Sequence, residues 1–360
     1  MAGAPMPEGG KIAVVLCALG GPDGPEAVEP FLFNLFNDRA IIALPGVLRW
    51  PFAKLIARRR APIAREIYGR IGGASPLRPN TEAQGAALAA AVQDLSPVRS
   101  FIAMRYWHPF SEAAAAAVKE WGAERVVLLP LYPQYSTTTS ASSRQAWQEA
   151  AARAGLTAPT TFVCCYPREA GFVKALAESV SAALEQVDAA GNAERPPRVL
   201  FSAHGLPRRT VERGDPYRWQ VEQSCAATVL AIGRRGLDWR VCYQSRVGPL
   251  EWIGPATSDE IAAAGADGVP LVVAPIAFVS EHSETLEELD MKYRELARRT
   301  GVPVYIRVPT VSTAPPFIAG LAGLVRRALA DGSAICPGDG MRICPAAATQ
   351  CPMKASGTEA

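Results

Sequence analysis

The sequence has few histidines, little net charge and no long apolar run. Among 360 residues there are three histidines, and the net charge is only +3. No basic cluster is interleaved with aromatic residues, so we expect no nucleic-acid partner. No apolar run approaches the roughly 18 residues of a membrane-spanning helix. The start, MAGAPMPEGGK, lacks the apolar core of a signal peptide, so we expect a cytoplasmic protein.

Composition and length indicate a soluble chain of two domains. Hydrophobic residues make up 49% of the chain and charged residues 20%, which is typical of a globular protein. A chain of this length exceeds one ordinary core of roughly 150 residues. In a reducing compartment the eight cysteines are expected to be core residues or metal ligands, not disulfides.

Strand-like and helix-like segments alternate along the chain. The expected strands are 12–18, 100–105, 125–131, 199–203, 239–243 and 271–278, and the clearest expected helices are 26–36, 111–121 and 144–154. This order predicts an α/β fold of two Rossmann-like domains, each a parallel sheet flanked by helices, with an active-site cleft between them. We expect domain 1 at 11–160 with an apolar lip at 31–60, domain 2 at 161–310, a C-terminal helix at 311–331 and a cysteine-rich tail at 332–360.

The stretch 271–290, LVVAPIAFVSEHSETLEELD, joins a strand signal to a crowd of titratable side chains. Ser280 is the expected N-cap of a helix. On an α-helical period, three carboxylates then share one face beside His282: Glu281, Glu284 and Glu288. No lysine or arginine follows before Lys292, so like charges repel unless a cation or a shared proton relieves them. Two interpretations stay open, a solvated acidic first turn and a carboxylate path for metal ions or protons.

All three histidines fall just past expected strand ends: His108, His204 and His282. His204 follows the strand 199–203 in the segment FSAHGLP, where Gly205 lets the backbone turn. A neutral imidazole can accept a proton near pH 7 or bind a metal, and the sequence does not choose between these roles. A satisfied core histidine is the alternative.

Eight motifs occur in one order along the chain: LGGP (19–22), RIGGASPL (70–77), RYWHP (105–109), YPQYSTTTSASS (132–143), FSAHGLP (201–207), RGDPY (213–217), QSRVGPLEWIGP (244–255) and PIAFVSEHSETLEELD (275–290). As an ordered set over about 12–310 they resemble ferrochelatases. The resemblance implies insertion of ferrous iron into protoporphyrin IX, giving protohaem and two protons, on two Rossmann-like domains without a nucleotide.

The resemblance also implies roles for individual residues. His204 would accept a pyrrole proton and Glu284 would assist it, with His282 and Glu288 continuing a metal or proton path. These four are the expected metal-handling residues. The expected porphyrin-contacting residues lie elsewhere: Arg105 and Tyr106 on an opposite wall, Trp252 against the macrocycle, and Leu19 at a position where some relatives have Met or Tyr and where simple packing is favoured.

Two further segments have alternative interpretations. The segment 31–60 is more apolar than a linker requires and ends in Arg58, Arg59 and Arg60. It either packs into the core or forms a lip on a membrane surface, which would place the protein at the periphery of the inner membrane. The hydroxyl-rich segment 136–143 is either an ordinary surface loop or an anion-binding turn.

The tail contains three cysteines that each precede proline: Cys336, Cys344 and Cys351. Their spacing fits no familiar zinc pattern, and a disordered tail is the alternative. The resemblance implies a [2Fe-2S] cluster, which needs four thiolates. Cys164 or Cys165 is the expected fourth ligand, and only one should serve because adjacent residues on a strand point to opposite faces. Three other cysteines are expected to be buried small hydrophobes: Cys17, Cys225 and Cys242.

Two other functions stay open besides chelation of protoporphyrin. One is a chelatase for coproporphyrin or another tetrapyrrole, because the residues that accommodate the propionates cannot be identified. The other is a non-catalytic haem or iron-sulfur binding protein, which needs no proton acceptor at His204. The oligomeric state is also open, with a homodimer as one expectation.

Overall fold

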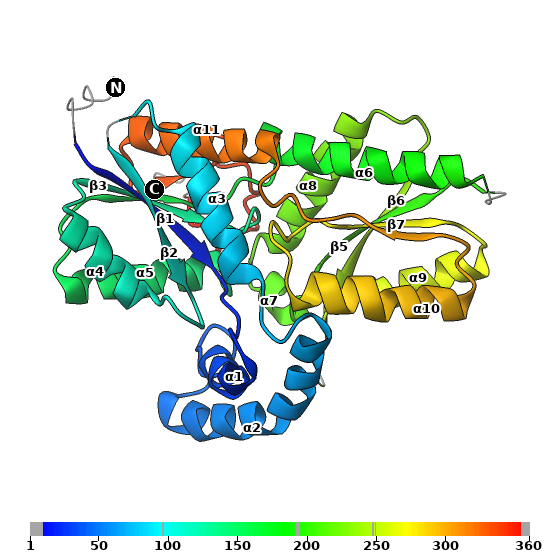
Figure 1. Ribbon diagram of the computed structural model, residues 1–360, viewed down its shortest axis with the longest axis horizontal. Helices are drawn as coiled ribbons and strands as arrows, with labels where there is room; N and C mark the ends of the chain where they lie inside the picture. The colour runs from blue at the N-terminus through cyan, green and yellow to red at the C-terminus, as the bar shows by residue number, and fades with distance from the viewer. Residues whose placement is uncertain (1–9, 96, 192–194, 247, 249, 354–360) are drawn as a thin grey trace. The chain divides into compact units, whose positions relative to one another are not determined.

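The computed structural model describes residues 10–95, 97–191, 195–246, 248 and 250–353. Positions 354–360 of the expected tail, and 247 and 249 of the QSRVGP motif, lie outside the described residues. The chain folds as two compact units, each built on its own sheet (Figure 1). The first unit comprises 1–165 and 321–341, and the second comprises 166–320 and 342–360.

The first unit contains a parallel sheet in the order β2-β1-β3-β4-β9. Its strands are β1 (Ile12–Ala18), β2 (Val98–Met104), β3 (Arg125–Pro130), β4 (Thr160–Val163) and β9 (Ile335–Cys336). All of β1 is buried, as expected for an apolar strand covered on both faces. Figure 1 shows α3 (Leu77–Ala91) on one face of this sheet and α4 (Ser111–Trp121) and α5 (Ser140–Ala154) on the other. A short helix at Pro25–Ala27, α1 (Val28–Phe36) and α2 (Gly46–Arg70) complete the unit.

The second unit contains a parallel sheet in the order β6-β5-β7-β8. Its strands are β5 (Arg198–His204), β6 (Asp238–Gln244), β7 (Leu271–Pro275) and β8 (Tyr305–Arg307). In Figure 1, α6 (Ala170–Ala190) and α8 (Tyr217–Ile232) lie on one face, and α9 (Thr257–Ala266) and α10 (Tyr293–Thr300) on the other. The remaining helices are α7 (Arg208–Glu212), the π-helix η2 (Glu284–Lys292) and α11 (Pro315–Asp331), whose residues are divided between the two units.

The predicted α/β architecture with two parallel sheets is confirmed, and several boundaries need correction. The expected strand 12–18 and helix 111–121 have the observed bounds. The expected strands 125–131 and 271–278 end earlier, at Pro130 and Pro275. Among the described residues no helix is both long and apolar enough to cross a membrane.

Candidate active site

His204 is the last residue of β5, one position beyond the expected end of the strand. Its Nδ1 lies 2.7 Å from Oε2 of Glu284, and the two side chains are 40% and 27% exposed. The hydroxyl of Tyr217 donates to the backbone carbonyl of His204. Within the part of the chain that the structure describes, Nε2 of His204 has no hydrogen-bond partner. Nε2 is therefore the nitrogen that can exchange a proton with a substrate.

Charge favours an ion pair between these two side chains. Burial alone would lower the pKa of His204, but the charge and hydrogen bond of Glu284 raise it above its ordinary value. Burial alone would raise the pKa of Glu284, but His204 and His282 lower it to about 2. At neutral pH Glu284 is therefore ionised, and the neutral form of His204 grows as the pH rises.

His282 lies beside this pair in a neutral state. Its Nδ1 accepts a hydrogen bond of 3.0 Å from the backbone N–H of Glu284, so the proton of the neutral ring is on Nε2. The ring stands edge-on to Phe278, with centroids 4.6 Å apart. Burial lowers the pKa of His282. This imidazole therefore orients the backbone at Glu284 and presents a neutral N–H.

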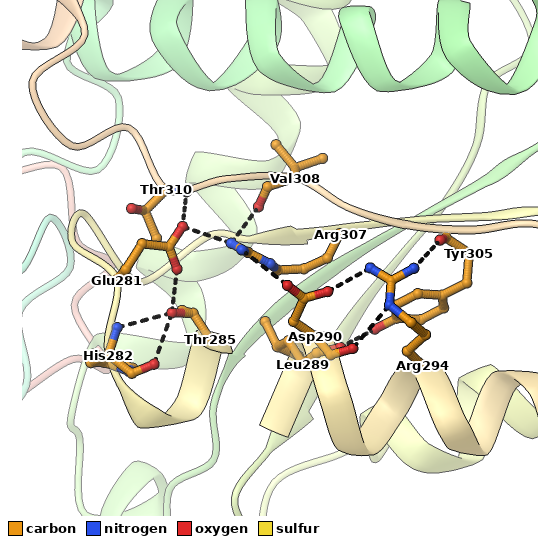
Figure 2. Close-up of polar contacts among 10 residues, drawn as sticks. All are labelled: Glu281, His282, Thr285, Leu289, Asp290, Arg294, Tyr305, Arg307, Val308 and Thr310. Atoms are coloured by element: carbon orange, nitrogen blue, oxygen red, sulfur yellow. Dashed lines mark hydrogen bonds and ion pairs between the residues drawn. The ribbon is translucent and has the colours of Figure 1, made fainter. Parts of the chain in front are cut away.

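The expected α-helix with one acidic face is wrong. Residues 284–292 form a π-helix that follows Ser283, and no side chain caps it, so Ser280 is not an N-cap. Gln244 lies against both Glu284 and Glu288, because its Nε2 donates to the Glu284 carbonyl at 3.0 Å and to Glu288 Oε2 at 3.2 Å. Glu281 lies outside this group and turns to Arg307 (Figure 2). The π-helix therefore gathers two carboxylates, not three, near His204.

Glu288 is surrounded by donors. Besides Gln244, its carboxylate accepts hydrogen bonds from the N–H and hydroxyl of Ser245 and from the hydroxyl of Tyr293. Lys292 lies 3.9 Å away. The described residues contain no group of three or more His, Cys, Asp or Glu side chains that could hold a metal ion. The four expected metal-handling residues therefore form no preformed metal site.

Trp252 lies next to the end of β5. Gly205 passes so close to its neighbours that a Cβ there would meet the Gln244 carbonyl oxygen at 3.0 Å and Trp252 Cε3 at 3.3 Å. Trp252 also forms a bridge with Pro207 and is half-buried. Glycine at 205 thus lets the indole approach the backbone beside His204.

In the first unit, Arg105 and Tyr106 converge on one buried carboxylate. Oδ2 of Asp38 accepts from the Tyr106 hydroxyl at 2.8 Å and the Ser142 hydroxyl at 2.7 Å, and lies 2.8 Å from Nη2 of Arg105. Arg105 Nε also donates to Ser142 at 2.7 Å. Burial would raise the pKa of Asp38, but Arg105 and these hydrogen bonds lower it. Asp38 is therefore a fixed anion that orients both expected substrate-side residues.

Leu19 packs against the apolar cluster that contains Tyr106, so its contacts fit the packing role. The surface-loop interpretation of 136–143 is wrong, because α5 begins at Ser140 and four serines are buried: Ser136, Ser140, Ser142 and Ser143.

Sequence reasoning missed Asp38, although it is the only acidic residue between 31 and 60. It also assigned no role to Gln244 and Ser245, which stand in the QSRVGP motif directly at the end of β6.

The cysteines form separate groups. Cys344 hydrogen-bonds to Cys351 and lowers its pKa to about 6, and Gln220 donates to Cys344 Sγ at 3.1 Å. Cys164 bonds through its backbone N–H to the carbonyl of Cys336. The expectation that Cys164 and Cys165 point apart is wrong, because β4 ends at Val163 and their Sγ atoms lie 3.7 Å from each other.

Burial of the remaining cysteines confirms their expected packing role. At most 1% of each residue is exposed at Cys17, Cys225 and Cys242, and burial raises the pKa of all three thiols. The tail up to Met353 has a described fold: β9 pairs with β4, and Cys336 and Cys344 are buried. The disordered-tail interpretation is therefore wrong for 332–353.

The expected lip divides between core and surface. Phe31 and Leu32 of α1 are buried in the first unit. On and before α2, large apolar side chains are exposed, among them Val47 at 83% and Trp50 at 50%. Four further apolar residues of α2 are exposed, Leu48, Phe52, Leu55 and Ile63, and so are the basic residues Lys54, Arg58, Arg59 and Arg60.

Comparisons with known proteins agree with the order of the motifs. A family model described as Ferrochelatase matches residues 11–329. The chain is 50% identical to a protein named Ferrochelatase from Phenylobacterium zucineum over 97% of this chain and 99% of that one. It is 48% identical to the protein of that name from Hyphomonas neptunium, over 96% and 95%. Among solved structures, SirB from Bacillus subtilis with Fe3+ has a similar fold, with a TM-score of 0.53 at 11% identity, covering 89% of this chain and 96% of SirB.

Proposed function

The chain belongs to the ferrochelatase family of metal chelatases, and on that premise we propose that it inserts ferrous iron into protoporphyrin IX, giving protohaem in the terminal step of haem synthesis. The observation that carries the proposal is the pair formed by His204 Nδ1 and Glu284 Oε2 at the carboxyl end of β5. A non-catalytic haem-binding protein needs no such base, whereas insertion of iron into a free-base porphyrin does.

The reaction exchanges two pyrrole protons for one ferrous ion. Neutral His204 accepts a pyrrole proton at Nε2 and becomes an imidazolium, and Glu284 stabilises that charge through Nδ1–H. Because its side chain is 40% exposed, His204 can pass the proton to water and accept the second. The porphyrin leaves as a dianion paired with Fe2+, so the product is neutral at its centre.

The other residue roles remain part of this proposal. A ferrous ion in transit suits a few weak oxygen and nitrogen donors, which Glu284, His282 and Glu288 offer when their present hydrogen bonds open. Trp252 would pack on the macrocycle, which is supported by its position over Gly205 beside His204. Arg105, 26% exposed and paired with Asp38, would contact the porphyrin, and Tyr106, 1% exposed, would act by holding Asp38 in place.

Anaerobic turnover with ferrous iron and protoporphyrin IX tests the proposed reaction. We expect protohaem from the wild-type protein and loss of nearly all turnover in His204→Ala, with an unchanged melting temperature as the control for folding. Rapid product from coproporphyrin, and none from protoporphyrin, would move the assignment to a coproporphyrin chelatase. Equal haem binding by both proteins with no product from either would indicate a binding protein.

A [2Fe-2S] cluster in the cysteine-rich segment is a separate proposal. Its support is the low pKa of Cys351 beside Cys344, since thiolates are the form that binds iron. The described residues offer cysteine pairs and no four-thiolate set, so no reaction step is assigned to the cluster. Four sulfurs would have to come from Cys336, Cys344, Cys351 and either Cys164 or Cys165. An absorption spectrum with iron and sulfide analysis of anaerobically purified protein tests this, with Cys351→Ser expected to lose both.

The exposed apolar side chains of α2 support a further proposal of peripheral contact with the cytoplasmic side of the inner membrane. Its apolar side chains would enter the headgroup region while Arg58, Arg59 and Arg60 meet anionic lipid. Cosedimentation with anionic vesicles should fall in Trp50→Glu and stay unchanged in Leu230→Glu, an exposed apolar residue of α8. A homodimer remains a prediction that light scattering would test.

A further inference from the structure

Arg307 lies behind the π-helix η2 and bonds to carboxylates near both of its ends. Its Nη1 donates to Oε1 of Glu281 at 2.7 Å, and its Nη2 lies 3.5 Å from Oδ2 of Asp290 (Figure 2). Glu281 precedes the first turn of η2, and Asp290 lies in its last turn. Arg307 itself is the last residue of β8, which pairs with β7 in the sheet. One guanidinium on the sheet therefore contacts a carboxylate just before η2 and another in its last turn.

The contact at Glu281 continues to the active site. The other carboxylate oxygen of Glu281 accepts a hydrogen bond from Thr285, and that hydroxyl oxygen accepts from the backbone N–H of His282 at 3.0 Å (Figure 2). His282 in turn accepts from the N–H of Glu284, the residue that faces His204. Four consecutive contacts thus connect Arg307 to the His204–Glu284 pair.

The guanidinium contacts the two carboxylates through its Nη atoms and leaves one of its own N–H donors, at Nε, without a partner among the described residues. Its side chain is 10% exposed, yet its Nε has no hydrogen-bond partner among the described residues. Arg198, at the start of β5, is similarly buried at 11% and also binds two carboxylates, but it bonds through all three nitrogens. Arg294 is a second cation on Asp290, but it is half exposed and makes no contact with Glu281.

We propose that Arg307 is a positioning residue for chelation, which acts by clamping Glu281 and Asp290 so that η2 holds Glu284 against His204. The proposal rests on the function proposed above. A lysine could not replace this arginine fully, because a single ammonium does not reach two separate carboxylates as a planar guanidinium does. The clamp also supplies the cation that the acidic stretch itself lacks.

Arg307→Gln with Arg198→Gln as the matched control tests the clamp. Both substitutions remove an equally buried arginine from the same sheet, but Arg198 lies at the opposite end of β5 from His204. Turnover is measured over a range of iron and porphyrin concentrations, well below the melting temperature of each variant. We expect kcat to fall about 10- to 100-fold in Arg307→Gln with little change in KM, because small misplacements of a catalytic group cost this much. We expect an unchanged kcat in Arg198→Gln and partial recovery in Arg307→Lys.

Amide hydrogen exchange provides a readout that does not depend on turnover. Peptides covering 284–292 should exchange faster in Arg307→Gln than in the wild type, and at the wild-type rate in Arg198→Gln. If Arg307→Gln and Arg198→Gln lower the melting temperature alike while kcat and exchange in 284–292 stay at wild-type values, Arg307 is merely structural and the clamp is overturned. Absence of product from the wild-type protein would overturn the proposed function instead, and the exchange experiment would still decide on the clamp.

Discussion

The charged group at His204 and the charged group at Asp38 differ in solvent exposure and in how many hydrogen-bond partners they have. His204 and Glu284 share one contact of 2.7 Å and are 40% and 27% exposed. Asp38 is 7% exposed, and three donors from Arg105, Tyr106 and Ser142 converge on one of its oxygens. In the open His204–Glu284 pair, Nε2 of His204 is left without a partner among the described residues and can accept a proton. The contacts of Asp38, which we call the closed group together with Arg105, Tyr106 and Ser142, instead fix the positions of its neighbours. We therefore assign proton transfer to the second unit and rigid orientation to the first.

After the loss of His204 itself, removing Glu284 should have the largest effect on turnover. Glu284→Gln keeps the shape of the side chain and removes the charge that stabilises the protonated imidazole. We expect kcat to fall about 100- to 1,000-fold, within the usual contribution of general acid–base catalysis. Anaerobic haem formation measures it. The neighbouring Glu287→Gln is the control, since Glu287 is buried on the same π-helix and has no assigned role in the reaction. Equal losses in both variants would contradict the assignment.

Removing Asp38 should instead affect stability most. Asp38→Ala leaves the Arg105 guanidinium, 26% exposed, without its carboxylate. We expect the free energy of unfolding of the first unit to fall by about 2 to 3 kcal/mol, somewhat less than for a fully buried ion pair. Urea unfolding followed by tryptophan fluorescence measures this loss. Asp94→Ala removes the partner of an exposed pair with Arg326 and should cost about 0.5 kcal/mol or less. Similar losses in the two variants would show that the buried Asp38 group stabilises the fold no more than an exposed ion pair does.

The sequence predicts the sheets well because their signals are local. The apolar run of β1 and the alanine-rich run of α4 specify those elements without help from distant residues. The position of His204 at a strand end follows from the same signal. Glycine after it is consistent with the close approach of Trp252, which only the structure shows.

The π-helix and the Asp38 group could not be predicted because they depend on distant partners. The carboxylate of Glu281 is held by Arg307 and by the backbone N–H of Thr310, which lie more than 20 residues later. The α-helical period therefore mispredicted which side chains of the acidic stretch share a face, because residues 284–292 form a π-helix. Likewise, the contact of Asp38 with Ser142 joins positions 104 residues apart. No local pattern marks such a pair, although a lone acid in a basic, apolar segment is a signal worth following.

The open pair should also set the pH dependence. Because Glu284 raises the pKa of His204, kcat/KM should rise with pH through a value above the ordinary 6.5. In Glu284→Gln this rise of kcat/KM, the acidic limb of the profile, should move to lower pH, since the carboxylate charge that raises the pKa of His204 is gone. The pair's contribution to stability should be fully present below about pH 6.5 and lost as the pH rises through the raised pKa of His204. It should also be lost on the acid side, as the pH falls from about 4.5 towards 2 and Glu284 is protonated.

Rate profiles from pH 5 to 9 and melting profiles from pH 2 to 9, for the wild type and Glu284→Gln, check these signs. Asp38→Asn is the control, because Asp38 belongs to the closed group and its loss should leave the position of the limb unchanged. A limb that stays in place in Glu284→Gln would show that another group titrates.

Apart from the control substitutions, the smallest expected effect comes from Ser142, and it decides whether Asp38 and its three donors act as a unit. Ser142→Ala removes one donor to Asp38 and one acceptor from Arg105, so we expect a loss of about 1 kcal/mol in the free energy of unfolding. If the hydroxyl acts through Asp38, the same substitution should cost much less in an Asp38→Asn background, and a double-mutant cycle from urea unfolding measures that difference. Ser143→Ala, a buried serine of the same helix that does not contact Asp38, should be additive with Asp38→Asn. If the costs of Ser142→Ala and Asp38→Asn are additive as well, the three donors act independently. The Asp38 group would then differ from the His204–Glu284 pair only in being more buried.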